Sequence, residues 1–517
     1  MRAFNLLLRH DLYWVLWGIF LLLLPNQLSA QEKSNPIPKS IQKMLLTSKL
    51  PESSLSFSIQ RLTPHTGLSQ LGWQANQAMN PASVMKILTT LAALDLIGPQ
   101  YRWKTNLYTT GYIEHGTLKG NLYWQGFGDP KLVPEELANM MLELRRLGIQ
   151  SIAGDLVLDR SAYHPSVKDS APDDGESKRA YNVAPDPLLY AFQTISFTIS
   201  QTNSKPVIQY TPRLTGLKIV NQLESVTGDC SNWSKSFKNT IQKTAPLQFT
   251  ALFSGNIPSA CSQIAWNTVA LDPDAFFKHG VMAAWEDAGG QWKSPPNIVL
   301  EKVPKHAQLL ISYRGTTLSD AVKDINKLSN NVMARHLYLT LAVERGVLPA
   351  STADSFQIVQ EWLKKNQLPM PELVIENGSG LSNIERISAE HLSQLLTKAV
   401  KSPTADYFIH SLPIAGIDGT MKHRLSDRLK KVFSSTKSNE KVFTPDPSMP
   451  LKLQQPGVLM KTGSLSQVRS IAGYVVSKSG QVYALTSIIN HPMAPSGGPV
   501  HDALLTWLLE DGLNDLK

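Results

Sequence analysis

The pattern of apolar and polar positions along the chain predicts an α+β framework that is interrupted by a long β-rich segment. Alternating apolar and polar residues in the segment 55–62 (LSFSIQRL) predict a strand. An apolar run that follows Asn80 and Pro81 and stops at Gly98 predicts a helix capped by Asn80. From residue 101 to about 303, Gly, Pro and polar clusters separate short apolar runs, and strands are predicted at residues 118–124, 154–159 and 206–210.

Helical periodicity returns in the last part of the chain. It covers residues 318–344, with a clear helix at 331–344, and recurs at 353–365 and 389–401. A further short helix is predicted near the N-terminus at 40–48. Strands are predicted at residues 458–462, 471–477 and 482–490, followed by a final helix near 501–509. The predicted order is therefore framework, insertion, framework.

The first thirty residues predict an export signal. Arg2 and Arg9 precede an uncharged apolar run at residues 12–24, Pro25 ends this run, and the small residue Ala30 suits cleavage. The run is too short to span a bilayer comfortably. An uncleaved anchor is the alternative interpretation. Either way, the signal predicts an exported protein, with the periplasm as its expected compartment.

Composition adds two limits. The 517 residues predict roughly two to four domains, and 42% hydrophobic with 18% charged residues excludes a disordered or fibrous chain. The net charge of +9 is not gathered into one tract, so it does not require nucleic acid as a partner. The two cysteines cannot form a zinc ribbon or an iron–sulfur site unaided. In an exported chain, Cys230 and Cys261 predict one structural disulfide, with two buried thiols as the alternative.

Ser83 and Lys86 are the first candidates for chemistry. Three residues apart in the first turn of a predicted helix, they share one helix face, so their side chains can meet. A serine hydroxyl needs an adjacent base, and a lysine whose pKa is lowered by burial can serve as that base. The S-x-x-K pattern occurs four times in the chain, where about two copies are expected by chance. The pair is therefore weak by itself, but the copies at Ser40, Ser434 and Ser438 lack the helix cap and the apolar run.

Two later motifs could complete a site with this pair. Ser329 and Asn331 could relay a proton and orient a substrate amide; alternatively, Ser329 is only the N-cap of the helix that follows. Lys461-Thr462-Gly463 follows an apolar strand and would suit an edge strand that binds an extended peptide and its carboxylate. In isolation, this second motif would also fit a strand that ends in a turn.

The order S-x-x-K, S-x-N, K-T-G is a strong combined signal. With it, the sequence resembles the class C low-molecular-mass penicillin-binding proteins, which are D-alanyl-D-alanine carboxypeptidase/endopeptidases of the penicillin-binding protein 4 kind. Further matching segments lie at residues 80–82, 126–130, 154–159, 377–382, 411–413, 418–420 and 472–474. The resemblance implies a penicillin-binding/β-lactamase-like transpeptidase domain, with an antiparallel sheet and helices on both sides. Its implied parts are residues 31–100 and 304–517, interrupted at 101–303 by two accessory domains, one nested in the other.

The resemblance also implies roles for these residues. Ser83 would be the nucleophile, Lys86 the base, and Ser329 the group that passes a proton to the leaving D-alanine. Asn331, Lys461 and Thr462 would hold the substrate, and the backbone N–H groups of Ser83 and Ser464 would form the oxyanion hole beside Gly463. Asp159 would read the side chain of the stem peptide's diamino acid.

The implied substrates are peptidoglycan stem peptides, β-lactams are the implied inhibitors, and no cofactor or metal is expected. The rival hypotheses are a β-lactamase-like hydrolase and a non-catalytic protein that binds peptidoglycan or senses β-lactams.

Overall fold

Strands from the two ends of the sequence combine into one five-stranded antiparallel sheet. A computed structural model describes residues 37–62, 70–170, 179–202, 205–436 and 449–516, so the predicted signal at 1–30 lies outside the described residues. The sheet order is β2-β1-β22-β21-β20. Its strands are β1 (Leu55–Arg61), β2 (Gln70–Trp73), β20 (Gly457–Leu465), β21 (Val468–Val476) and β22 (Val482–Asn490). Strands predicted more than 390 residues apart are thus direct neighbours, with Leu55 opposite Ile489.

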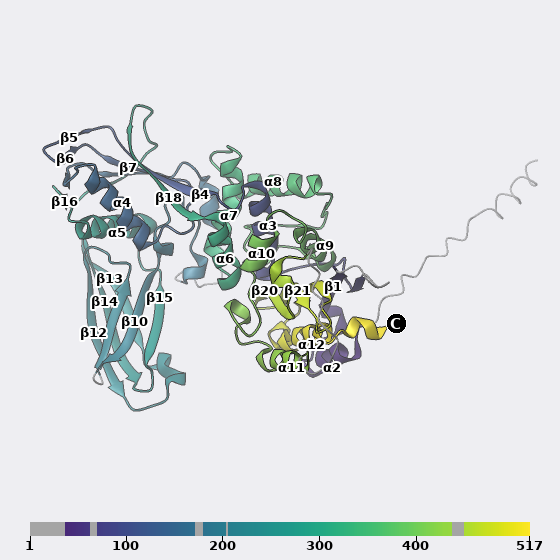
Figure 1. Cartoon of the computed structure of the whole chain (residues 1–517). Helices are drawn as coiled ribbons and strands as arrows, with labels where there is room; N and C mark the ends of the chain where they lie inside the picture. The colour runs from purple at the N-terminus through teal and green to yellow at the C-terminus, as the bar shows by residue number, and fades with distance from the viewer. Residues whose placement is uncertain (1–36, 63–69, 171–178, 203–204, 437–448, 517) are drawn as a thin grey trace, which may run out of the picture. The chain divides into compact units, whose positions relative to one another are not determined.

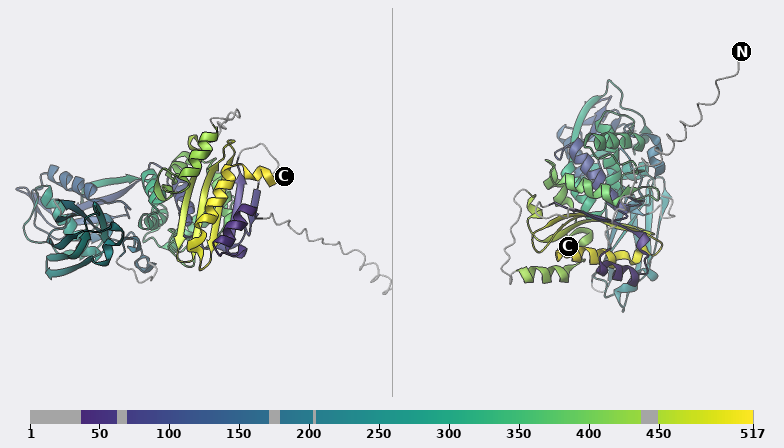
Figure 2. Two further views of the ribbon diagram at one scale, coloured as in Figure 1. Left: turned by 90° about the horizontal axis from the view of Figure 1, so that it is seen from below. Right: turned by 90° about the vertical axis from the view of Figure 1, so that its right-hand side faces the viewer.

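Helices cover both faces of this sheet, as the resemblance implies. Thr486 and Ser487 are adjacent on β22, so their side chains point to opposite faces. Thr486 bonds Ser393 of α9 (Ala389–Ala399), whereas Ser487 contacts His501 of α12 (Gly498–Leu509). The helix α2 (Lys39–Thr47) packs against α12. Figure 2 shows α2 and α12 together beside the sheet.

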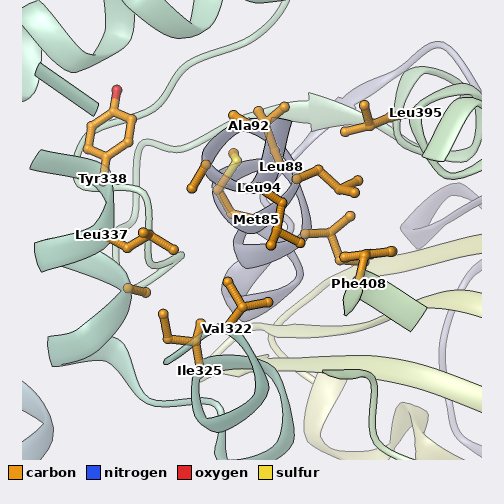
Figure 3. Packing of buried hydrophobic residues seen from close by; sticks show 14 of the residues in the cluster. Met85, Leu88, Ala92, Leu94, Val322, Ile325, Leu337, Tyr338, Leu395 and Phe408 are labelled. Carbon is orange, nitrogen blue, oxygen red and sulfur yellow. The ribbon is translucent and has the colours of Figure 1, made fainter. Parts of the chain in front are cut away.

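The helix α3 (Lys86–Leu96) forms the centre of the helical layer. Nine of its residues, Lys86 to Leu94, are buried. Apolar side chains from neighbouring helices surround Met85, Leu88 and Ala92 (Figure 3). These neighbours are α6 (Leu318–Leu328), α7 (Asn331–Glu344), α8 (Thr352–Lys365), α9 and α10 (Ala405–Ser411). A helix buried on all sides is a rigid platform for groups at its N-terminus.

The segment between α3 and α6 is rich in strands, as predicted (Figure 1). One sheet has the order β17 (Ile298–Leu300), β9 (Leu156–Asp159), β7 (Leu122–Gly126), β4 (Arg102–Thr109), β18 (Gln308–Thr317). A second has the order β16 (Gln291–Trp292), β8 (Ser151–Ile152), β6 (Thr117–Lys119), β5 (Tyr112–Glu114). The helices of this segment are α4 (Pro134–Arg146) and α5 (Pro273–Asp287).

Two three-stranded sheets lie between β9 and β16 in sequence. They are β11 (Lys205–Thr211), β10 (Ile195–Thr202), β15 (Gln263–Thr268), and β12 (Leu217–Val226), β14 (Gln248–Pro258), β13 (Lys238–Ala245). Cys230 and Cys261 are bonded to each other here, which confirms the predicted disulfide. The division of the chain into domains at residues 100 and 304 stays a prediction.

One sequence prediction of a single element is wrong. Residues 118–124 are predicted as one strand, but they are divided between β6 and β7, which belong to different sheets. The break falls at Gly120, where a Cβ would lie 2.7 Å from the Cα of Gly111, so the chain can turn there only without a side chain. The helical periodicity of residues 318–344 corresponds to two helices, α6 and α7, and the second spans Asn331–Glu344 as predicted. Between them, Ser329 takes a left-handed conformation (φ 57°).

Candidate active site

Ser83 lies in a tight turn that leads into α3. The turn is a 3-10 helix, η2 (Ala82–Met85), and the α-helix itself begins only at Lys86. The sequence prediction of an α-helix from Pro81, capped by Asn80, is therefore wrong in detail. Asn80 Oδ1 does cap the chain, but it accepts from the N–H of Ala82 (2.8 Å), at the start of the 3-10 turn.

The conformation of this turn is held by its surroundings. Ala82 has φ 47°, a left-handed value that is strained for a residue with a side chain. Two strands of the sheet oppose the strain: Ser470 Oγ on β21 donates to Pro81 O at 2.5 Å, and Asn490 Oδ1 on β22 accepts from Asn80 N–H at 2.8 Å. The sheet therefore holds Asn80 and Pro81, which directly precede the strained Ala82.

Lys86 is directly beside Ser83. Its Nζ lies 3.0 Å from Ser83 Oγ and 2.6 Å from Asn331 Oδ1, and it also donates to Ser379 O. A neutral amine has two N–H donors and one lone pair. The two carbonyl oxygens can accept both donors, which leaves the lone pair for the hydroxyl of Ser83. The arrangement therefore suits a lysine that takes a proton from this serine.

Electrostatics favours the neutral amine. Lys86 is completely buried, and this burial, assisted by the charge of Lys461, lowers the pKa of Lys86 well below its usual value, while Glu385 opposes the shift. Burial also lowers the pKa of Lys461 to about 7. Near neutral pH, Lys86 can therefore act as a base, whereas Lys461 exchanges between its charged and neutral forms.

The second and third motifs meet each other as well. Lys461 Nζ donates to Ser329 Oγ at 2.8 Å and to Thr462 O at 2.7 Å. Ser329 is the C-cap of α6, and the N-cap of α7 is Asn330, whose side chain accepts from Met333 N–H. The alternative in which Ser329 serves only as an N-cap is therefore wrong.

The K-T-G motif lies inside β20, at the edge of the sheet. Outside this strand, Ala415 N–H donates to Val458 O and Met460 N–H donates to Pro413 O. Because the outward groups alternate along a strand, Thr462 and Ser464 also present their backbone groups to this edge. Ser464 is exposed. A peptide could therefore extend the sheet there.

Gly463 allows β20 to approach Ser83 closely. A Cβ at Gly463 would lie 3.0 Å from Ser83 N and 2.2 Å from Ser470 Oγ, so a larger residue would separate the strand from the turn. The residues of the three motifs, which are far apart in sequence, thus form one connected site: Ser83, Lys86, Ser329, Asn331, Lys461, Thr462, Gly463 and Ser464.

Asp159 has a different environment. It is 3% exposed on β9, and its carboxylate accepts from Ser161 N–H (3.0 Å), Val303 N–H (3.0 Å) and Gln125 Nε2 (3.2 Å). These partners all belong to the inserted segment. Within the described residues, Asp159 has no hydrogen bond with the motif residues, so its predicted role in reading the substrate gains no support from its contacts.

Sequence reasoning assigned no role to several residues of the site. Thr420 Oγ1 accepts from Thr462 Oγ1 at 2.8 Å and is exposed, so two hydroxyls stand together at the end of β20. The neighbouring Asp418 forms an ion pair with Lys327 of α6 (2.7 Å), which anchors the loop that carries Thr420. The matching D-G-T segment was the available signal, but nothing in one sequence shows which strand it contacts.

The loop of residues 377–382 also contributes to the site. Ser379 accepts from Lys86 through its carbonyl oxygen, and a Cβ at Gly380 would lie 1.9 Å from Ala82 O. Every residue type has a backbone carbonyl group, so the acceptor at residue 379 cannot be recognised from the sequence. The two glycines at 378 and 380 were the available indication that the backbone approaches another segment closely here.

Among the described residues, no three His, Cys, Asp or Glu side chains are grouped so that they could hold a metal ion. The described helices also include none with the length and apolarity needed to cross a membrane.

The fold and the site together define the class of protein: a penicillin-binding fold with a serine–lysine pair at the start of a buried helix. The crystal structure of penicillin binding protein 4 from Haemophilus influenzae matches this fold with a TM-score of 0.67 and 21% identity, over 92% of this chain and 99% of that one. The same protein complexed with a β-lactam matches with a TM-score of 0.64.

The family follows from the sequence comparison. Residues 37–438 match the D-Ala-D-Ala carboxypeptidase 3 (S13) family, and the chain belongs to this family. It is accordingly a serine-type D-Ala-D-Ala carboxypeptidase and an extracytoplasmic enzyme. The D-alanyl-D-alanine carboxypeptidase DacB of Haemophilus influenzae is 24% identical over 86% of this chain and 87% of its own length. The D-alanyl-D-alanine carboxypeptidase of an Actinomadura species is 25% identical over 86% of this chain and 79% of its own.

Proposed function

We propose that this enzyme removes the terminal D-alanine from peptidoglycan stem peptides in the periplasm, through an acyl-enzyme on Ser83. The observation that carries the proposal is the hydrogen-bonded pair of Lys86 Nζ and Ser83 Oγ (3.0 Å), with Lys461 Nζ on Ser329 Oγ (2.8 Å) in the same site. A nucleophile in contact with a base is the arrangement that acyl transfer requires.

The proposed reaction begins with the attack of Ser83 Oγ on the carbonyl carbon of the penultimate D-alanine. The hydroxyl proton passes to Lys86 Nζ as the C–O bond forms, and the backbone N–H groups of Ser83 and Ser464 stabilise the oxyanion. Ser329 then relays a proton to the leaving amine as the C–N bond breaks, and the proton that Lys86 took from Ser83 replaces the one that Ser329 gives up. In the second half of the reaction, water attacks the ester carbonyl and gives a proton to Lys86, and Lys86 returns a proton to Ser83 Oγ as the ester C–O bond breaks.

Substrate binding is proposed to use the edge of β20. Lys461 and Thr462 hold the terminal carboxylate, and Asn331 orients the amide next to the scissile bond. The same carboxylate contact would be met by a cross-linked peptide whose D-alanine is joined to a diamino acid, so endopeptidase activity belongs to the proposal. β-Lactams present a strained amide and a carboxylate in similar positions and should acylate Ser83.

The test is the variant Ser83→Ala. We expect it to lose both labelling by a fluorescent penicillin and release of D-alanine from a pentapeptide, with an unchanged melting temperature. Labelling that survives the substitution would refute the assignment. Rapid turnover of penicillin by the wild type would favour a β-lactamase, and binding of stem peptide without D-alanine release would favour a non-catalytic protein.

A further inference from the structure

Glu385 is a completely buried carboxylate beside the proposed base, and the mechanism above does not use it. It follows the 377–382 loop and lies two residues before β19 (Ile387–Ser388). Its Oε1 accepts hydrogen bonds from the N–H groups of Glu376 (3.2 Å), Asn377 (3.1 Å) and Gly378 (3.3 Å). Its Oε2 has no hydrogen-bond partner among the described residues. A buried acid in this condition needs an explanation.

The loop held by Glu385 is the one that contacts α3. Gly378 O accepts from Thr89 Oγ1 at 2.6 Å, and Ser379 O accepts from Lys86 Nζ. Glu385 thus fastens the start of the loop, and the next residue along the loop, Ser379, carries the acceptor that orients the base. Glu385 is therefore connected to Lys86 through the 377–382 loop. In this arrangement Glu385 acts on the base and does not need to contact the substrate.

Among the described residues, Glu385 interacts electrostatically with side chains on α3 and α7. Lys86 on α3 favours the ionised form of Glu385, and Glu385 in turn helps to raise the pKa of Tyr338 on α7. Burial raises the pKa of Glu385 to about 7, although the three N–H groups and Lys86 oppose that shift. Seen from Lys86, Lys461 is a like charge and Glu385 is an opposite one.

We propose that Glu385 is a positioning residue for the acylation step, which holds the 377–382 loop against α3 and supplies the negative charge that keeps Lys86 basic enough to take the proton of Ser83. This inference rests on the proposed function of Ser83 and Lys86. When the Ser83 O–H bond breaks and an N–H bond forms on Lys86, the site gains a buried ammonium. The carboxylate of Glu385 stabilises that ammonium.

The test is the variant Glu385→Gln, whose amide oxygen can still accept from the loop but carries no charge. The measurement is the rate constant for acylation by a fluorescent penicillin between pH 5 and 9. Loss of the negative charge lowers the pKa of Lys86, so the acid limb should move to lower pH, by on the order of one unit. The rate on the plateau should fall, because a weaker base accepts the proton of Ser83 less readily.

The matched control is Glu390→Gln. Glu390 is also a buried glutamate, on α9, and its carboxylate accepts from Ser58 Oγ (2.8 Å) and Gln60 Nε2 (3.0 Å). This change removes a buried charge without contact to the loop, so the acid limb should stay in place. A folded Glu385→Gln enzyme with the wild-type acid limb would overturn the proposal. Absence of acylation in the wild type would instead contradict the proposed function.

A second measurement covers the case in which Glu385→Gln does not fold. In Lys86→Met, the side chain can no longer become an ammonium beside the carboxylate, so the pKa of Glu385 should rise. Infrared titration of the protein labelled with ¹³C-glutamate would show a carboxylate midpoint near pH 7 for Glu385 in the wild type, next to that of Glu136 at about 8, and in the variant the first midpoint should move upward. Identical titrations of the two proteins would overturn the proposed coupling.

Discussion

The close approach of Gly380 to the nucleophile turn gives the sharpest prediction. Gly380 has φ +79°, and a Cβ added to it would lie 1.9 Å from Ala82 O and 2.7 Å from Ser83 N. The first separation is about 1.5 Å shorter than an ordinary van der Waals contact. In Gly380→Ala, either the loop or the turn must therefore move by about 1 Å or more. The turn carries Ser83, and the loop carries the acceptor of Lys86.

The effect of Gly380→Ala has two parts, the backbone strain of a left-handed alanine and the displacement of the reacting groups. A left-handed alanine costs about 1–2 kcal/mol wherever it occurs. Gly98 offers a matched control, because it has φ +93° with nothing within 4 Å of an added Cβ. Gly98→Ala should therefore show the loss of stability alone. Gly380→Ala should show a similar or larger loss together with a decrease of about 100-fold in acylation, which is typical when reacting groups are misplaced by 1 Å.

The assay is stopped-flow acylation by a fluorescent penicillin, combined with thermal unfolding of both variants. Unfolding identifies the strain common to the two alanines, and acylation identifies the displacement that only one of them causes. If Gly380→Ala is acylated within threefold of Gly98→Ala, the loop does not press on the nucleophile turn, and the reasoning is refuted.

Three further predictions concern Lys461, Thr420 and the disulfide. Because the pKa of Lys461 is lowered to about 7, its ammonium form is lost above that pH, and kcat/KM for a D-Ala-D-Ala peptide should fall by up to tenfold per pH unit on the alkaline side; a flat profile to pH 9 would contradict this. Thr420→Val removes one of two paired hydroxyls and should raise KM about five- to tenfold, whereas Thr404→Val, which loses a similar pairing with Ser402 (2.9 Å), should not. Replacing Cys230 and Cys261 by serine should lower the free energy of unfolding by up to about 3.7 kcal/mol for a separation of 31 residues, while penicillin acylation at 20 °C persists; unchanged thermal unfolding would exclude that contribution.

The residues of the site could largely be found from sequence, because each motif requires particular side chains at a fixed local spacing. Ser83 and Lys86 are three residues apart, so local backbone geometry alone brings them together. The apolar run before Lys461 likewise indicates the strand character of β20, and the two-residue period of a strand places Thr462 and Ser464 on one edge. The cysteine pair could be predicted too, since an exported chain with only two cysteines has one possible internal bond.

Other features depended on contacts between segments that are distant in sequence. The 3-10 turn at Ala82 is stabilised by hydrogen bonds of Pro81 with Ser470 and of Asn80 with Asn490, which are 389 and 410 residues apart in sequence, and no local pattern indicates such partners. The left-handed conformation of Ser329 and its hydrogen bond with Lys461 could not be predicted from local sequence, because Lys461 lies 132 residues away. Glu385 looks like an ordinary acidic loop residue until the fold buries it beside the base. Local sequence sets which groups are available, whereas burial and long-range packing decide their conformations, their pKa values and their partners.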